Sequence, residues 1–159
     1  MADAMTKLTR DRFIPFLNAG TEAQPAWKRV DYSTIFSLDP KPQTRELDYI
    51  CFENTVTEVS GYRPELAQEI ALYEGNPLYD FLFELFFRLP VGSDAQRPAL
   101  ICFGGSGRRC WYCPACTVTL GELDTVEGRI RFTMSLGGDI VRGTYAIVDG
   151  APVFTPEAP

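Results

Sequence analysis

The residues best suited to chemistry in this sequence are its cysteines. Cys110, Cys113 and Cys116 follow one another as C-x2-C-x2-C, Cys102 lies shortly before them, and Cys51 is distant. Three thiols at this spacing, with Cys102 as a fourth, could bind zinc, although zinc sites of four cysteines usually combine two separate pairs. An iron–sulfur cluster of the ferredoxin type would need a further cysteine nearby, which is absent. A disulfide, or buried reduced thiols on a strand and its entry loop, are the other interpretations.

The sequence contains no histidine, which removes the commonest general base and the commonest metal ligand. A Ser-His or Cys-His nucleophile is therefore excluded. The glycine-rich turn at 104–107 lacks the Gly-Lys-Ser/Thr ending of a phosphate-binding loop, and no helix is expected after it. We accordingly expect no enzyme and no cofactor, with zinc on the four clustered cysteines as the alternative.

Length and composition are those of an ordinary globular chain. The 159 residues suffice for one domain with a real core; 45% of them are hydrophobic and 23% are charged. The net charge of −6 disfavours binding to phosphate backbones, and it fits either simple solubility or a surface that nucleic acid passes without adhering. No run of 18 apolar residues and no signal-peptide core is found, so we expect no membrane partner and synthesis in the cytosol.

The segment 76–90, NPLYDFLFELFFRLP, predicts a helix over 77–89. Its asparagine suits an N-cap, a proline occupies the first helical position, and a second proline ends the run. Glu84 and Arg88 are spaced to form an ion pair. The core-facing stripe consists of Leu78, Phe81, Leu82, Leu85, Phe86 and Leu89. A second apolar stripe consists of Tyr79, Phe83 and Phe87. Either a long loop of the same chain or a neighbouring subunit must cover this second stripe.

Seven segments predict strands, because β-branched and aromatic residues gather there or because apolar and polar residues alternate. They are 27–36, 44–51, 66–73, 100–103, 116–120, 129–136 and 140–148. The segment 66–73 also suits a helix, since LAQEIALY is rich in helix formers. The last two segments, separated by a Gly-Gly-Asp turn, predict an antiparallel hairpin.

The expected fold is mostly β, a β-sandwich or barrel of about seven or eight strands with one flanking α-helix. The chain divides into an N-terminal arm over 1–26, a β domain over 27–148 and a C-terminal arm over 149–159. Within the β domain, residues 52–65 are expected to form a long loop between strands, because they contain Ser-Gly and proline.

Three stretches carry a resemblance to a known family. They are WKRVDYSTIFSLDPKPQTRELDYI (27–50), TEVSGYRPELAQEIALYEGNPLYDFLFELFFRLPVGSDA (57–95) and GRIRFTMSLGGDIVRGTY (128–145). In their overall run and order they resemble the major tail tube proteins of long-tailed, non-contractile bacteriophages. The resemblance extends over most of the chain and rests on long patterns, not on catalytic signatures. It provides no expectation for the cysteines at 110–116.

The resemblance implies a structural role. Members of that family fold as a β-sandwich or barrel with one flanking helix, form rings of six copies, and stack these rings into a tube. DNA and the tape measure protein pass through its lumen. The loop 52–65 and the two arms would reach adjacent subunits and rings. Further partners would be the tail terminator and tail-tip proteins. The protein would be located in the virion tail, after assembly in the host cytoplasm.

Two sets of residues follow from this interpretation. The subunit-interface candidates are Tyr79, Phe83, Phe87, Phe52 and Tyr62. The lumen-facing candidates are Glu46, Asp48, Glu69, Arg129, Arg131 and Arg142. DNA would slide past without specific binding, so the arginines must be offset by acidic groups or must pair across subunits. The alternatives to a tube subunit are a small zinc-binding module and a ring-forming tube protein of a bacterial secretion or injection system.

Overall fold

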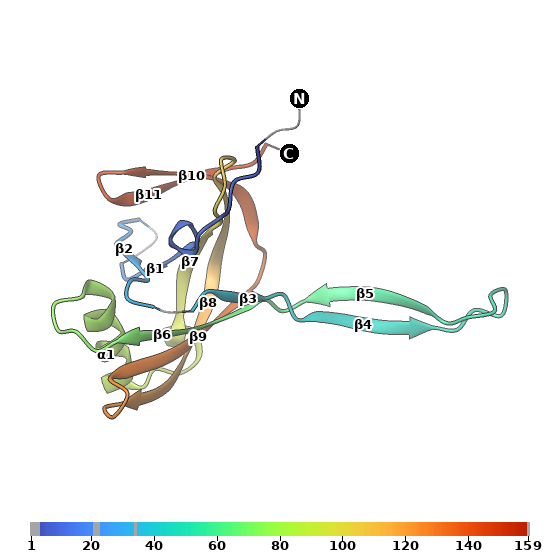
Figure 1. Cartoon of the computed structure of the whole chain (residues 1–159). Coiled ribbons are helices and arrows are strands. Elements are labelled where there is room, and N and C mark those ends of the chain that lie inside the picture. The colour runs from blue at the N-terminus through green and yellow to red at the C-terminus, as the bar shows by residue number, and fades with distance from the viewer. Residues whose placement is uncertain (1–3, 21–22, 34, 159) are drawn as a thin grey trace.

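The computed structural model describes residues 4–20, 23–33 and 35–158 (Figure 1). The strands are β1 Ile14–Asn18, β2 Trp27–Arg29, β3 Ser37–Asp39, β4 Pro42–Leu47, β5 Val56–Tyr62, β6 Glu65–Ala71, β7 Gln96–Cys102, β8 Arg109–Asp124, β9 Arg129–Gly137, β10 Val141–Val148 and β11 Ala151–Pro156. The helices are α1 Pro77–Arg88 and the short 3-10 turns η1 Arg10–Arg12 and η2 Gly92–Ala95. The predicted class, mostly β with one α-helix, is confirmed for the described residues, with more strands than expected.

Nine strands form one antiparallel sheet, and β4 and β5 form a separate ribbon. The main path runs β2-β1-β7-β8-β9-β6-β3, and the hairpin β10–β11 joins it through β8. The two ends of this path, β2 and β3, do not pair with each other in the described part of the chain, so the sheet is open rather than closed into a barrel. The segment 66–73, which also suited a helix, is the strand β6.

The long strand β8 explains why the hairpin expected over 129–148 is wrong. Its second half pairs with β9 and its first half pairs with β10, both antiparallel. β9 and β10 therefore run in the same direction, one after the other, along β8. The glycines between them interrupt this path without reversing it; Gly138 has a φ of 70°. β10 pairs with β11 instead, through Asp149 and Gly150, whose φ values are both positive as a two-residue hairpin turn requires.

Strands β1 and β7 are buried on both faces, which gives the body two cores. On one face, Leu17 belongs to the main core, together with side chains of α1, β6, β8 and β9. On the other face, Phe16 belongs to a smaller core, which the hairpin β10–β11 covers with Tyr145 and Phe154. Strand β9, in contrast, alternates strictly between buried and half-buried residues, as its sequence predicts.

The helix α1 begins as its sequence predicts. The Asn76 side chain accepts a hydrogen bond from the backbone N–H of Leu78 at 3.2 Å, and a proline follows the cap. The core-facing side is buried through Leu78, Leu82 and Leu85. The expectation for Leu89 is wrong: it is the C-cap, with a φ of 50°, and 67% of its surface is exposed because the chain leaves the helix there.

The strands β4 and β5 form a two-stranded ribbon that projects from the body (Figure 1). The strand predicted over 44–51 is shifted toward the N-terminus, and the loop predicted over 52–65 contains β5, so both expectations are corrected. In the two strands only Leu47 and Gly61 are even partly buried. The half-buried face predicted for 44–51 is missing, because no other layer covers the ribbon within the described ranges.

The sheet also includes parts of both segments that were assigned to arms. β1 lies within 1–26 and pairs with β7 of the body. Its hydrophobic side chains are buried in both cores. β11 lies within 149–159 and pairs with β10 along its whole length. The strand predicted over 27–36 is reduced to β2, followed by β3. Residues 1–3, 21–22, 34 and 159 of these predicted segments lie outside the described residues.

Candidate assembly surfaces

The four cysteines between 102 and 116 lie on β7 and β8 but separate into two groups. Cys102 and Cys110 face each other across these strands in the smaller core, with their Sγ atoms 3.7 Å apart. Cys113 and Cys116 lie in the main core. Over the described ranges, no group of three or more Cys, His, Asp or Glu residues is arranged to hold a metal ion. Zinc binding stays a prediction, and elemental analysis of protein purified without chelator would test it.

A β-bulge explains how Cys113 and Cys116 share a face in spite of their odd spacing. The register between β7 and β8 shifts, so that two steps on β7, from Arg97 to Ala99, correspond to three steps on β8. The extra residue on β8 brings the side chain of Cys116 back to the same face of the sheet as that of Cys113. The Cys113 thiol then donates a hydrogen bond to the backbone carbonyl of Gly137 at 3.3 Å.

Three of these thiols are held in their protonated form. A hydrogen bond with Cys110, together with burial, raises the pKa of Cys102, and burial raises the pKa of Cys113 and of Cys116. Nucleophilic attack and metal ligation both use the thiolate. In this arrangement the cysteines act as small hydrophobic side chains of two cores, which is one of the interpretations that their sequence spacing left open.

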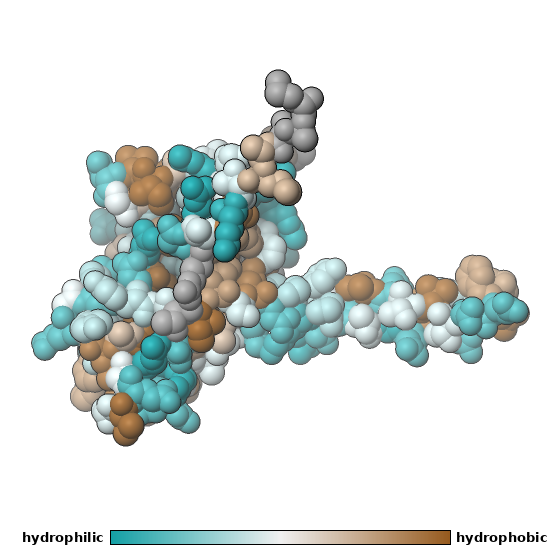
Figure 2. All heavy atoms as spheres, viewed as in Figure 1, coloured by the Kyte–Doolittle hydropathy of each residue, from teal (hydrophilic) through white to brown (hydrophobic). Residues whose placement is uncertain are grey.

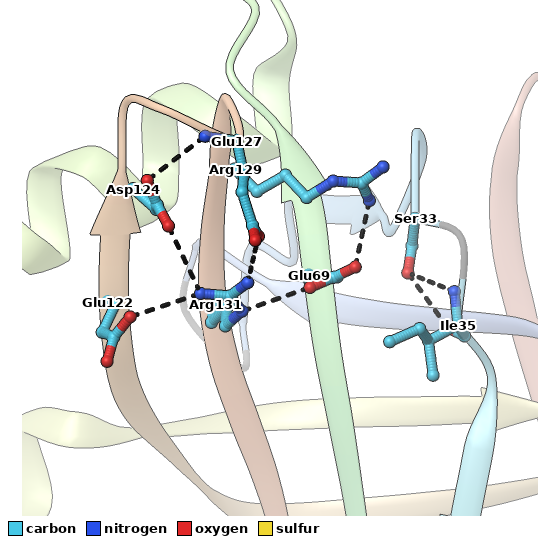
Figure 3. A network of polar contacts seen from close by, with 8 residues as sticks. All are labelled: Ser33, Ile35, Glu69, Glu122, Asp124, Glu127, Arg129 and Arg131. Carbon is cyan, nitrogen blue, oxygen red and sulfur yellow. Dashed lines mark hydrogen bonds and ion pairs between the residues drawn. The ribbon is translucent and has the colours of Figure 1, made fainter.

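Among the lumen-facing candidates, the structure brings together Glu69, Arg129 and Arg131 (Figure 3). Glu69 of β6 lies between the two arginines of β9 and accepts hydrogen bonds from both, at 3.1 Å from Arg129 and 3.2 Å from Arg131. Arg131 also donates to Glu122 and Glu127. These acidic partners raise the pKa of Arg131, and the hydrogen bond that Glu127 accepts from it is the largest cause. Acidic groups of the same subunit therefore offset this pair of arginines.

The other lumen-facing candidates lie elsewhere in the molecule. Glu46 is exposed on the ribbon strand β4, and Asp48 follows it at the ribbon end. Arg142 is exposed near the start of β10. The six residues therefore lie on the ribbon, on β10 and on the β6–β9 pair, and only the last three are in contact with one another.

The second apolar stripe of α1 is exposed in this chain. Phe83 is 43% exposed and Phe87 is 74% exposed, while Tyr79 is partly buried. The three rings follow one another along the helix, with centroids 6.1 and 6.4 Å apart. Glu84 and Arg88 pair beside them, as predicted. No loop covers this helix stripe within the described residues, so it is available to a neighbour.

The ribbon is the second surface that carries interface candidates. Phe52 and Tyr62 are 58% and 61% exposed. Figure 2 shows hydrophobic residues among hydrophilic ones along the ribbon and at its end. We call residues 48–55 the ribbon tip. Tyr49 and Ile50, which lie there, were missed, because the alternating pattern of 44–51 pointed Tyr49 toward a core. The absence of any lysine or arginine from 46 to 62 was the available sign of an unusual segment.

Comparison with known proteins defines the fold class. Neither a protein-family model nor a curated protein matches the sequence. The fold is similar to the PVC sheath/tube terminator of an extracellular contractile injection system, with a TM-score of 0.57 and 11% identity, over 88% of this chain and 99% of that one. It is equally similar to the anti-feeding prophage cap, a tube terminating cap, with a TM-score of 0.57 and 13% identity, over 91% of this chain and 95% of that one.

The similarity includes nearly the whole length of all three chains, and at such low identity it concerns the fold. The shared fold is mostly β with one helix. One neighbour is a sheath/tube terminator of a contractile injection system and the other is a tube terminating cap, so the narrower resemblance to tail tube proteins of non-contractile phages stays a prediction. No helix among the described residues is long and apolar enough to cross a membrane.

Proposed function

We propose that this chain is a structural, non-enzymatic subunit of a phage-like tail, which associates with copies of itself into rings at the tail tube or its end. The observation that carries the proposal is the fold shared with two tube-terminating proteins along nearly the full length of each chain. Two exposed apolar surfaces, the helix stripe and the ribbon, support it, because a soluble monomer rarely leaves such surfaces uncovered.

The resemblance seen in the sequence gives the proposal its finer form. Six copies form each ring, rings stack around a lumen, and DNA passes through without specific binding. Tape measure, tail terminator and tail-tip proteins are the partners, and the virion tail is the location. The acidic surplus around Arg131 fits a wall that repels phosphate, since four carboxylates surround two arginines there.

Electron microscopy of the purified protein at low and high concentration, with light scattering on the same samples, tests self-association. Rings or short tubes with a central hole are the expected result. A chain that stays monomeric at every concentration, also when mixed with the other tail proteins of its gene cluster, contradicts the proposal.

A double substitution tests the role of the helix stripe in assembly. Phe83→Ala with Phe87→Ala should raise the concentration needed for half-assembly by about tenfold or more, because buried aromatic anchors dominate interface energy. The chain should stay folded, since both rings are exposed in the monomer. Glu84→Ala with Arg88→Ala changes the adjacent polar face of the same helix and serves as the matched control. Unchanged assembly of the phenylalanine variant would remove the helix stripe from the interface.

A second candidate function is that of a ring-forming tube protein of a bacterial secretion or injection system, which the similarity to the terminator of a contractile injection system favours. Both candidates use the same assembly chemistry, so the discriminating observation is genetic. Adjacent genes for a tape measure protein and a terminator would indicate a phage tail, and an adjacent sheath gene would indicate a contractile system.

A further inference from the structure

Three arginines converge on one pocket of the body. The pocket lies where the turn 104–107, the start of β8, and strands β10 and β11 meet, and it measures about 690 Å³. Arg108, Arg109 and Arg142 line it, and all three side chains are exposed. Phe103 and Trp111 add aromatic surface to the same pocket. We call it the arginine pocket.

The charge of this pocket opposes that of the whole chain. None of its three arginines forms an ion pair in the part of the chain that the structure describes. Among the residues that the structure describes, Glu157 is the only carboxylate that lines it, so the net charge of the pocket is positive on a chain of net charge −6. Unpaired guanidinium groups beside aromatic rings suit a ligand that offers carboxylates together with an apolar or aromatic group.

The ribbon tip offers that combination. Asp48 and Glu53 lie at its two sides, and neither is in an ion pair in the described ranges. Between them, Tyr49 and Phe52 pack edge to face with ring centroids 6.0 Å apart, and a backbone hydrogen bond of 3.1 Å between the same residues closes the turn. Ile50 is fully exposed. The tip is therefore an acidic knob with an aromatic and aliphatic end.

The tip cannot reach the arginine pocket of its own chain. The six residues of β4 extend the ribbon by about 20 Å, at about 3.3 Å per residue. Figure 1 shows the ribbon directed away from the body and from the hairpin β10–β11 that borders the pocket. Any contact between tip and pocket joins two molecules.

We propose that the ribbon tip of one copy docks in the arginine pocket of a second copy, with Asp48 and Glu53 paired to the arginines and the tip aromatics against Phe103 and Trp111. The inference rests on the proposed function, and names the two surfaces that join neighbouring subunits. Because tip and pocket are different patches, the contact is head-to-tail and repeats around a ring or along a stack.

Disulfide trapping between two kinds of chain tests this contact directly. Cys51 lies at the tip and is exposed, and Thr155 lines the arginine pocket. A mixture of the natural chain with a tagged Cys51→Ser, Thr155→Cys chain should give a heterodimer under mild oxidation. The matched control is Cys51→Ser, Thr119→Cys, which places an exposed cysteine on β8 away from the pocket. A heterodimer with Thr119→Cys as abundant as with Thr155→Cys overturns the proposal.

Charge exchange provides the second test. Arg109→Glu with Arg142→Glu should weaken assembly at least about tenfold, as should Asp48→Lys with Glu53→Lys. A mixture of the two variants should recover it, because the reversed charges match again. Lys7→Glu with Arg63→Glu alters two exposed cations elsewhere and controls for net charge. If the mixture of the two charge-reversed variants assembles no better than either variant alone, the contact is overturned.

The outcomes separate this inference from the proposed function. Rings that form equally in the charge-reversed variants, without cross-links, overturn the docking and leave ring assembly standing. A monomeric chain without cross-links overturns both. Binding of a single-stranded 20-mer DNA that requires Arg109 and Arg142, with no heterodimer, overturns the docking in favour of a phosphate ligand.

Discussion

The ribbon β4–β5 and the central strands β6, β9 and β8 are built on the same antiparallel hydrogen bonding but bury very different surfaces. In β9 every second residue is buried, whereas in β4 no residue is fully buried. A two-stranded hairpin by itself is only marginally stable in water. Strand pairing alone therefore does not distinguish a strand that belongs to a hydrophobic core from one that exposes both of its faces. The body has cores of its own, and the ribbon carries apolar groups that no other part of the described chain covers.

Thiol reactivity should show the largest difference between these regions. Cys51 at the ribbon tip is exposed, and Cys102, Cys113 and Cys116 are fully buried in the body. The buried thiols can be labelled only when the body opens. We therefore expect them to react about 10³-fold or more slowly than Cys51. Mass spectrometry of iodoacetamide-treated native protein measures the rates. Cys51→Ser is the control, and body thiols that react as fast as Cys51 would contradict the buried assignment.

A pair of phenylalanine substitutions should show the next largest difference. Phe132→Ala in β9 removes a side chain that is 2% exposed and should lower the free energy of unfolding by about 3–5 kcal/mol. Phe52→Ala at the ribbon tip should change it by less than about 0.5 kcal/mol. Urea unfolding of both variants checks the prediction. A large cost for Phe52→Ala would mean that the tip is part of the monomer core.

Alkaline pH should destabilise the body through three of its buried thiols, those of Cys102, Cys113 and Cys116. Their pKa values are raised in the folded state, so above the pKa of about 8.5 of an unfolded cysteine only the unfolded chain loses these protons. The unfolded state then binds fewer protons, and stability falls as pH rises. One pH unit above that value, a thiol that stays fully protonated in the folded state should cost about 1.4 kcal/mol. Unfolding at pH 7 and 9.5, compared with Cys116→Ala, measures the effect, and identical pH dependence in that variant contradicts it.

The ion pairs should give the smallest contrast. Glu69, with a side chain 19% exposed, joins two arginines in the body, while Arg45 and Glu58 pair on the ribbon with side chains 61% and 45% exposed. Double-mutant cycles should give a coupling about two- to threefold larger for Glu69 with Arg131 than for Arg45 with Glu58. Equal couplings at both sites would show that burial does not strengthen the body pair.

The sequence predicts the elements whose burial follows a single period. The helix α1 and the strand β9 each have a clear period, together with caps or flanking glycines, and the structure confirms both. The predictions fail where the local pattern does not determine the structure. Val56–Tyr62 has no buried face to reveal a strand, and the glycines at 137–138 suggest a turn unless the length of β8 is known.

The candidate surfaces were predictable in part for the same reason. Phe83 and Phe87 could be recognised as exposed because a helix has only one core-facing side. The separation of the cysteines into two cores could not be predicted, because it depends on a β-bulge that is visible only in the pairing of β7 with β8. Nor could the arginine pocket, since Arg142 joins Arg108 and Arg109 only through the pairing of β10 with β8.

The order in which the ribosome releases the chain gives the first strand a further significance. Phe16 in β1 pairs with Leu100 in β7, so β1 leaves the ribosome long before its partner exists. At about 5–20 residues per second, this apolar strand waits several seconds without either core. The ribbon pairs only nearby residues and can close much earlier. During synthesis the exposed ribbon can therefore form before the body from which it projects.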